Sequence, residues 1–312
     1  DLDTMKVITQ SNLEPGFHKT CFNSPYVDHL VKEIQEVVRQ YPNCDGIFLA
    51  IINQAPCACE HCMKVLREHG WDPHNPEDLK KVAQIGETGY ASLAEAIAAA
   101  PDGTATTITL LSDVDFGDYG ANALTIPAGK TVTLDLNGKQ ISGRTTSTSG
   151  SYMITNKGVL TLTDSVGGGR VLTGADPAWQ YRDDGVFAGS YASAAFRNEG
   201  DMTVAGGTIE NAGEGSACYA IDCYNGGNVT ISGGKLRTAK SMTVRMFYGT
   251  GTVKVAGGEL VSGTRYALQL MGGSSRAEIS GGTVEGKYGI VVNANSQTAP
   301  KVSLAVTGGT IK

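Results

Sequence analysis

Alternating apolar and polar residues that lead into a pair of glycines recur along the last part of the chain. Each copy reads apolar-x-apolar, then Ala, Ser or Thr, then Gly-Gly, x and a final apolar residue. The copies are TVAGGTI (203–209), VTISGGKL (229–236), VKVAGGEL (253–260), AEISGGTV (277–284) and LAVTGGTI (304–311). Their first glycines stand at positions 206, 233, 257, 281 and 308, so the steps are 27, 24, 24 and 27 residues. A period in the twenties built from short alternating strands predicts a solenoid of stacked coils.

The solenoid is predicted to be a parallel β-helix. Leucine-rich repeats share the period but need a Leu/Asn ladder, which this chain lacks. Runs of Val, Ile and Thr punctuated by glycine favour strands that stack ~4.8 Å apart, and glycine pairs permit turns with positive φ. Less regular runs fit the same scheme at 131–141, 152–156 and 158–164. At ~24 residues in each coil, we expect roughly nine coils.

A short helix is predicted immediately before the first coil, within YASLAEAIAAAPDG (90–103). Ser92 is placed to cap this helix, and Glu95, three residues on, completes a capping box. The helix would cover strand edges that are otherwise open. On this pattern, residues 87–312 resemble the pectin-lyase-like right-handed parallel β-helices of bacterial surface proteins. The resemblance implies a mainly β fold and a secreted or cell-surface location.

One outer face of the β-helix can be drawn from the alternation within AFRNE, AIDCYN, TVRMFY, ALQLMG and GIVVNA. One apolar residue of each segment is placed inward, namely Phe196, Ile221, Val244, Leu268 and Ile290. The residues that follow them then stack outward as Arg197, Asp222, Arg245, Gln269 and Val291. Two positions later, a second outward column reads Glu199, Tyr224, Phe247, Met271 and Asn293.

These columns support two interpretations, and both stay open. Aromatic faces stack on sugar rings while polar groups bond hydroxyls, so an exposed face of this kind suits an oligosaccharide or polysaccharide. Its candidate binding residues are Arg197, Tyr224, Arg245, Phe247 and Gln269. Alternatively, the alternating charges form a cross-strand ladder that only stabilises the sheet, and the protein is a structural stalk.

A glycoside hydrolase is the alternative function. Hydrolysis of a glycosidic bond usually uses two carboxyl groups that flank the bond. Asp222 and Glu199 lie on neighbouring columns, and Asp183 and Asp184 lie in the loop YRDDGVF (181–187), which we expect to overhang the face. These four residues are the catalytic candidates if the β-helix is an enzyme.

The composition changes abruptly near residue 85. All five histidines and five of the seven cysteines precede it, whereas all but three of the 41 glycines follow it. Two segments of different physical type are therefore joined here. We divide the chain into a small α/β segment (1–84), a linker with the capping helix (85–104) and the β-helix (105–312).

A cysteine cluster is the sharpest motif of the first segment. Cys57, Cys59 and Cys62 lie within PCACEHC (56–62), at a spacing that matches a structural zinc site with four thiolates. Cys21 is the expected fourth ligand, with Cys44 in reserve and His61 as a competitor for one position. Free or disulfide-paired thiols are the alternative, although so short a spacing makes poor disulfides.

Around the cluster, the pattern predicts alternating helices and strands. Ser24 and Pro25 predict the start of a helix. Apolar residues then recur on one face at helical spacing: Val27, Leu30, Val31, Ile34, Val37 and Val38. GIFLAII (46–52) is typical of a buried parallel strand, and the cysteine loop follows it. Helix, strand, functional loop and helix is the order of a (β/α) barrel.

With these elements, CFNSPY (21–26), DGIFL (45–49) and CACEHC (57–62) resemble the middle of certain glycoside-hydrolase barrels. The families are glycosyl-hydrolase-like proteins related to the fucosidases and, more distantly, the family forty-two β-galactosidases. The latter have a zinc site of one early Cys plus Cys-x-Cys-x-x-Cys. The resemblance implies a catalytic acid after the strand, where this chain has Ala50 and, further on, Gln54. Neither side chain exchanges a proton near neutral pH, so we expect an inactivated piece of a barrel.

Charge narrows the range of partners. The chain has 25 Lys and Arg against 31 Asp and Glu, a net charge of −6, which argues against nucleic acid because phosphates need a basic surface. No apolar run approaches the ~18–20 residues of a membrane-spanning helix. Because residue 1 is Asp and no signal peptide follows, we expect a mature product. The sequence therefore predicts an extracellular, carbohydrate-associated protein with a structural zinc ion. It does not specify an oligomeric state.

Overall fold

The computed structural model divides the chain into two compact units, Asp1–Lys80 and Lys81–Lys312. It describes residues 26–41, 64, 68, 81–145, 150–175, 193–213, 215, 217–247, 250–271, 273–293 and 302–312. The division comes a few residues before the change in composition. Strand β1 (Ala83–Ile85) accordingly belongs to the second unit, where it pairs with β3 (Ala105–Leu110).

Helix α1 (Tyr26–Gln40) is the element described in the first unit, and it agrees with the helix expected after Pro25. Asp28 lies in its first turn and Arg39 in its last, where each charge interacts favourably with the helix dipole. Its apolar stripe is largely exposed, most of all at Val31, Val37 and Val38. The expected strand at 46–52 lies outside the described residues.

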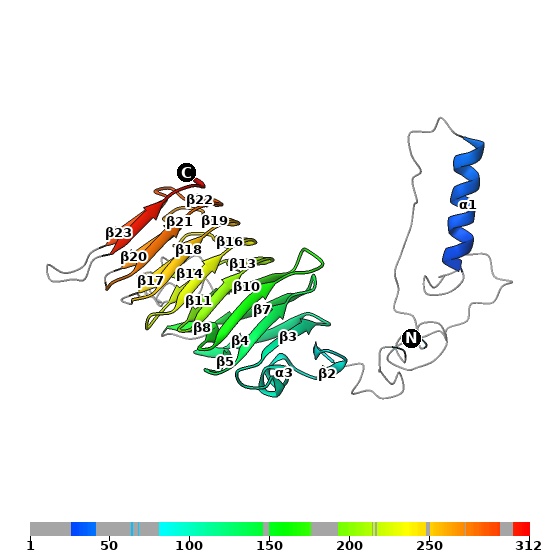
Figure 1. Ribbon diagram of the computed structural model, residues 1–312, viewed down its shortest axis with the longest axis horizontal. Helices are drawn as coiled ribbons and strands as arrows, with labels where there is room; N and C mark the ends of the chain where they lie inside the picture. Colours follow the sequence, from blue (N-terminus) through cyan, green and yellow to red (C-terminus); the bar gives the residue numbers. More distant parts are fainter. Residues whose placement is uncertain are drawn as a thin grey trace, which may run out of the picture. The chain divides into compact units, whose positions relative to one another are not determined.

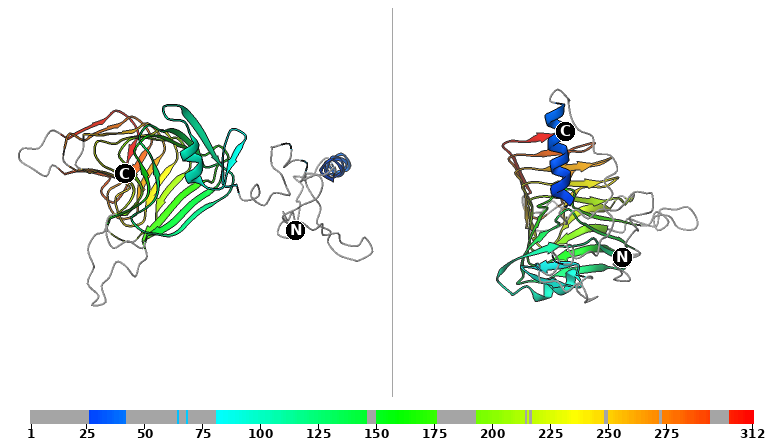
Figure 2. Two further views of the ribbon diagram at one scale, coloured as in Figure 1. Left: turned by 90° about the horizontal axis from the view of Figure 1, so that it is seen from below. Right: turned by 90° about the vertical axis from the view of Figure 1, so that its right-hand side faces the viewer.

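The second unit is a parallel β-solenoid with three sheets (Figures 1 and 2). Sheet A contains, in spatial order, β2 (Thr88–Tyr90), β1, β3, β6 (Thr131–Asp135), β9 (Val159–Thr163), β12 (Asp201–Val204), β15 (Asn228–Ile231), β18 (Thr252–Val255), β21 (Arg276–Ile279) and β24 (Ser303–Val306). Sheet B contains β25 (Thr310–Ile311), β22 (Thr283–Glu285), β19 (Glu259–Ser262), β16 (Lys235–Thr238), β13 (Thr208–Asn211), β10 (Arg170–Ala175), β7 (Gln140–Thr145) and β4 (Val114–Tyr119). Sheet C contains β23 (Ile290–Asn293), β20 (Leu268–Met271), β17 (Val244–Phe247), β14 (Cys218–Cys223), β11 (Ser193–Asn198), β8 (Ser151–Asn156) and β5 (Asn122–Ile126).

Every third strand along the chain is a neighbour in space, and the chain visits sheets A, B and C in turn. Neighbouring coils pair in parallel, as in β12 with β15, whereas the entry strands β1 and β2 pair antiparallel. The parallel solenoid predicted from the glycine repeat is therefore confirmed. The nine coils expected are too many, because sheet C, among the described residues, is 7-stranded. The chain takes more than 24 residues for several coils, and 42 positions separate the first residues of β9 and β12.

The apolar residues predicted to point inward form the core. Phe196, Ile221, Val244 and Leu268 have no exposed surface, and Ile290 packs against the same cluster. These residues pair directly from coil to coil along sheet C. The core is thus a continuous column inside the solenoid, whose stacked coils are drawn in Figure 1.

Helix α3 (Leu93–Ala99) covers the first coil, as predicted. The Ser92 hydroxyl accepts a hydrogen bond from the Glu95 amide at 3.2 Å, and the buried face of the helix presents Leu93, Ala96 and Ile97. Lys130, which precedes β6, extends its ammonium group to the C-terminal end of this helix. It donates to the carbonyls of Ala98, at 3.2 Å, and Ala100, and it pairs with Asp102 at 3.0 Å. A cation at this end is favourable because the last helical carbonyls have no partner within the helix.

Glycine pairs form the corner between sheets A and B. The second glycine of each pair has positive φ, between 70° and 82° at Gly207, Gly234, Gly258, Gly282 and Gly309. The first glycine is required for a different reason, close approach of the coils. A Cβ at Gly257 would lie 2.4 Å from the Ser232 carbonyl oxygen of the preceding coil. Both glycines are therefore needed for coils to stack at this corner.

Buried asparagines organise the corner between sheets C and A. Asn156 donates from Nδ2 to Asn198 Oδ1 at 2.7 Å, and Asn198 donates in turn to the Asn228 carbonyl at 2.8 Å. The amide of Gly158 donates to Asn156 Oδ1 at 3.2 Å. These side chains replace backbone partners where the chain turns away from the sheet. They hold successive corners at a constant spacing, and the outer surface of this corner is the groove described below.

Candidate functional site

The two predicted outward columns are present on sheet C. In the register of the parallel strands, Arg197 lies beside Asp222, Asp222 beside Arg245 and Arg245 beside Gln269. We call this set the charged column. The second set runs beside it at the edge of the sheet, where the Glu199 amide bonds the Asn156 carbonyl and so places Lys157 in the same column. We call this second set the rim column: Lys157, Glu199, Tyr224, Phe247 and Met271.

The charged column is largely buried, which corrects the expectation of a flat exposed face. Asp222 is 0% exposed, Gln269 6% and Arg245 7%. A second apolar cluster, separate from the core and including Tyr152 and Tyr219, covers these side chains. The buried residues of this cluster belong to neither of the two predicted columns.

A local irregularity in the strands brings these tyrosines out of the core. The amides of Ala220 and Ile221 both donate to the Thr243 carbonyl, at 3.0 and 3.1 Å. Alternation is interrupted there, because Ala220 and Ile221 both belong to the core while Tyr219 belongs to the outer cluster. The signal in the sequence is a recurring Tyr-x-(Ile/Leu), found at Tyr152, Tyr219, Tyr266 and Tyr288.

Asp222 and Arg245 form a buried bidentate ion pair. Arg245 donates from Nε to Asp222 Oδ1 at 2.7 Å and from Nη2 to Oδ2 at 2.6 Å. The guanidinium carbon lies 4.1 Å from the centroid of the Tyr219 ring and 4.3 Å from that of Phe247. Burial raises the pKa of the Asp222 carboxyl, and the contact with Arg245 opposes that rise. Burial raises the pKa of Tyr219 to about 12, so its hydroxyl stays neutral.

Arg197 and Glu199 form a second ion pair that is partly open to solvent. Arg197 Nε lies 2.6 Å from Glu199 Oε1, with side-chain exposures of 27% and 18%. The guanidinium carbon lies 4.2 Å from the Tyr224 ring centroid and 4.9 Å from that of Tyr152. The Tyr152 hydroxyl donates to the Tyr224 hydroxyl at 3.4 Å, and the rings of Tyr224 and Phe247 have centroids 4.9 Å apart. Arg197 is thus stacked on aromatic rings from the two adjacent coils, and Arg245 on one ring from the preceding coil and one from its own strand, at cation–π distances.

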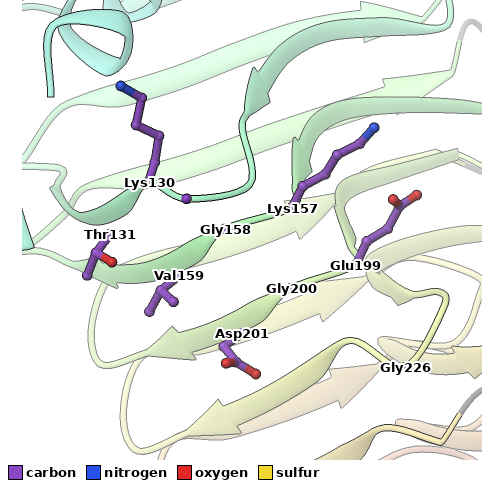
Figure 3. A pocket seen from close by; sticks show the side chains of 10 residues that line it. Lys130, Thr131, Lys157, Gly158, Val159, Glu199, Gly200, Asp201 and Gly226 are labelled. Atoms are coloured by element: carbon purple, nitrogen blue, oxygen red, sulfur yellow. The ribbon is translucent and has the colours of Figure 1, made fainter. Parts of the chain in front are cut away.

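A groove of about 360 Å³ lies at the corner beside the rim column (Figure 3). Its backbone passes through Gly158 and Gly200, and a Cβ at Gly200 would lie 2.1 Å from the Gly158 carbonyl oxygen. In Figure 3, Lys157 and Glu199 extend in the same direction from adjacent coils, while Asp201 extends the opposite way. The other lining residues are Gly129, Lys130, Thr131, Val159 and Gly226. Glu199 therefore belongs both to the groove and to the ion pair with Arg197.

Other predicted site residues lie outside the described part of the chain. These are the catalytic candidates Asp183 and Asp184 and the zinc-ligand candidates Cys21, Cys57, Cys59 and Cys62, together with Cys44 and His61. Within the described residues, no group of three or more His, Cys, Asp or Glu side chains could hold a metal ion. Cys218 and Cys223 are buried and free. The zinc site therefore stays a prediction.

Metal analysis of the intact chain tests that prediction. We expect about one tightly held zinc ion per chain, because four thiolates form a closed structural site. Replacement of Cys57 by serine is expected to remove the metal, as measured by elemental mass spectrometry after dialysis. Cys218→Ser is the matched control, because this thiol belongs to the solenoid, and it is expected to retain the zinc. Wild-type protein without zinc after purification in its presence would contradict the site.

Within the described residues, no helix combines the length and apolar character needed to cross a membrane. The chain was compared with protein-family models, curated proteins and solved structures, and none of the three comparisons found a match.

Proposed function

We propose that the outer face of sheet C and the adjoining groove bind an oligosaccharide or polysaccharide without cleaving it, in an extracellular bacterial protein. The observation that carries the proposal is the partly exposed set Arg197, Glu199, Tyr224 and Phe247 on sheet C and its rim, of which Glu199 also lines the groove. We call these four residues and the groove the binding surface.

The chemistry of the binding surface suits sugar rings. Aromatic faces at Tyr224 and Phe247 can stack on pyranose rings, and a guanidinium beside a carboxylate supplies donors and acceptors for hydroxyl groups. The stacking of Arg197 and Arg245 between aromatic rings restricts their rotamers. Side chains ordered in advance lose less conformational entropy when a ligand binds. These features support recognition by a rigid surface.

The carboxylates favour binding over hydrolysis. A glycosidase places two carboxyl groups on either side of the scissile bond. Both Asp222 oxygens accept hydrogen bonds from Arg245, and the side chain has no exposed surface, so a substrate has no access to it. Glu199 lies at the groove but pairs with Arg197. A purely structural charge ladder is the alternative that remains, since cross-strand charge pairs also stabilise sheets.

A glycan-array screen on the intact chain, followed by calorimetry on the best ligand, tests the proposal. We expect Tyr224→Ala to weaken binding about two- to tenfold, since an aromatic contact contributes ~0.5–1.5 kcal/mol and 1.4 kcal/mol is tenfold. Tyr224→Phe keeps the ring and is expected to bind almost as wild type. Binding to none of the glycans would favour a structural stalk. Release of reducing ends that depends on Glu199 would establish a hydrolase and overturn the proposal.

A further inference from the structure

We infer that the binding surface selects neutral glycans and that Glu199 is the residue that excludes acidic ones. The inference rests on the proposed function, because it concerns the class of ligand at the same site. It follows from how charges are paired on the described surface. Cations at the binding surface are the groups that could attract an anionic ligand. Whether each cation already has an anionic partner therefore decides whether the surface attracts acidic glycans.

Four cations lie at or directly beneath the binding surface, and three of them are held by anions of the chain itself. Arg245 uses two guanidinium nitrogens on Asp222, and Arg197 pairs with Glu199 at 2.6 Å. Lys130 pairs with Asp102 and bonds two carbonyls at the end of α3. The fourth cation, Lys157, is exposed; Asp201, the fourth anion, lines the same groove and extends the opposite way (Figure 3). These four cations and four anions together give the binding surface no net charge.

Glu199 is placed where an acidic sugar would meet it. Its carboxylate lies at the groove, and Asp201 supplies a second carboxylate from another strand. A uronate or sulfate on the Glu199 side of the groove would face this carboxylate, and like charges brought together on desolvation are unfavourable. Repulsion of an unwanted ligand is a common source of specificity. The net charge of the whole chain, −6, adds to the repulsion at long range.

Removing the charge of Glu199 should reverse this preference. Glu199→Gln keeps the side-chain size but leaves the guanidinium of Arg197 without the carboxylate that pairs with it. Lys157, in the adjacent rim column, is a second cation close to this position. A carboxylate of the ligand could then supply the missing negative charge at the exposed part of the Arg197 side chain, and hydrogen bonds between ionised groups are stronger than neutral ones. We expect affinity for acidic glycans to rise at least about tenfold, which corresponds to 1.4 kcal/mol. Neutral glycans should change much less.

Matched oligosaccharides provide the experiment. The probes are galactose and galacturonate oligomers of one chain length, and mannose and mannuronate oligomers of the same length, titrated into the intact chain by calorimetry at low and high salt. Wild type is expected to bind a neutral member with little salt dependence and to bind its acidic counterpart at least about tenfold more weakly. Glu199→Gln should gain acidic binding that salt weakens. The control is Glu259→Gln, which removes the same charge from an ion pair of 2.6 Å with Lys235 on sheet B and should leave both ligand classes unchanged.

The outcomes separate the two claims. Preferential binding of acidic oligomers by wild type, or an equal gain in Glu259→Gln, would overturn the role of Glu199 while the proposed glycan-binding function stands. Loss of folding in Glu199→Gln, read from its melting curve, leaves the wild-type comparison of neutral and acidic probes as the deciding test. Failure of every probe and of the glycan array would overturn the proposed function and the inference with it.

Discussion

Replacement of Asp222 by asparagine is expected to lower the free energy of unfolding by about 3–5 kcal/mol, the cost of leaving a buried charge without its partner. Arg245 stays protonated in the variant, because its pKa lies far above neutrality. Arg245 is only 7% exposed as a residue, and its guanidinium lies between two aromatic rings, so water cannot replace the lost carboxylate. Chemical denaturation monitored by circular dichroism measures the effect.

An exposed ion pair of the same chemistry provides the control. Arg144 donates from Nε and Nη2 to the two Asp118 oxygens at 3.0 and 3.2 Å on sheet B, and both side chains are about half exposed. Asp118→Asn is expected to cost at most about 1 kcal/mol, because solvent screens exposed pairs. Equal losses of unfolding free energy in the two variants would show that burial of the Asp222–Arg245 pair does not determine its contribution to stability.

A double variant shows whether the loss of stability comes from the unpaired charge of Arg245 or from the absence of the ion pair itself. Asp222→Leu combined with Arg245→Met removes both charges and keeps apolar volume beneath Tyr219 and Phe247. Buried pairs replaced in this way often leave stability unchanged or raise it. The double variant is therefore expected to recover most of the stability that Asp222→Asn loses. For the same reason, loss of any activity in Asp222→Asn identifies a catalytic group only when the variant is shown to be folded.

Substitution of alanine at Gly258 is expected to destabilise the solenoid by about 2–5 kcal/mol. The residue has φ of +70°, a region that costs an L-residue ~1–2 kcal/mol. A Cβ there would also lie 2.6 Å from the Gly233 carbonyl oxygen of the preceding coil, and overpacking typically costs ~1–3 kcal/mol. Thermal and urea unfolding followed by circular dichroism measure the loss.

Gly120→Ala is the matched control for the corner glycine. A Cβ at Gly120 would meet nothing within 4 Å, and its φ is not in the positive region. We expect unfolding of this variant to differ from wild type by less than about 0.5 kcal/mol, the usual range for a surface substitution. A Gly258→Ala protein as stable as the control would mean that the coils can separate locally at little cost.

The repeat made the fold predictable because its constraints are local. Each glycine pair meets the backbone of the adjacent coil, so the spacing of the pairs along the chain sets the register of the strands. The alignment of Arg197 with Asp222 and of Asp222 with Arg245 follows from that register. The Ser92 cap is equally local, since the donor is only three residues away. The number of coils was harder to predict, because coils in the middle of the chain depart from the repeat length.

The exposure of the site depends on contacts that the repeat does not contain. Strict alternation placed Asp222 and Arg245 on an outer face, which is correct, but it also implied that they were open to solvent. The irregularity at Ala220 turns Tyr219 onto that face, and the tyrosine rings then cover the ion pair. The groove likewise arises from glycine corners of separate coils. Nothing in the alternation of one strand predicts such a surface.

The link between Lys130 and the capping helix has a further consequence for how the solenoid comes apart. Helix α3 packs on strands β3 and β5, whereas Lys130 lies just before β6 and bonds the end of the same helix. The helix is therefore fastened to the second layer of sheet A as well as the first. Detachment of the cap must break the contacts of Lys130 with the end of the helix, so we expect the helix to open together with the first two coils more readily than alone.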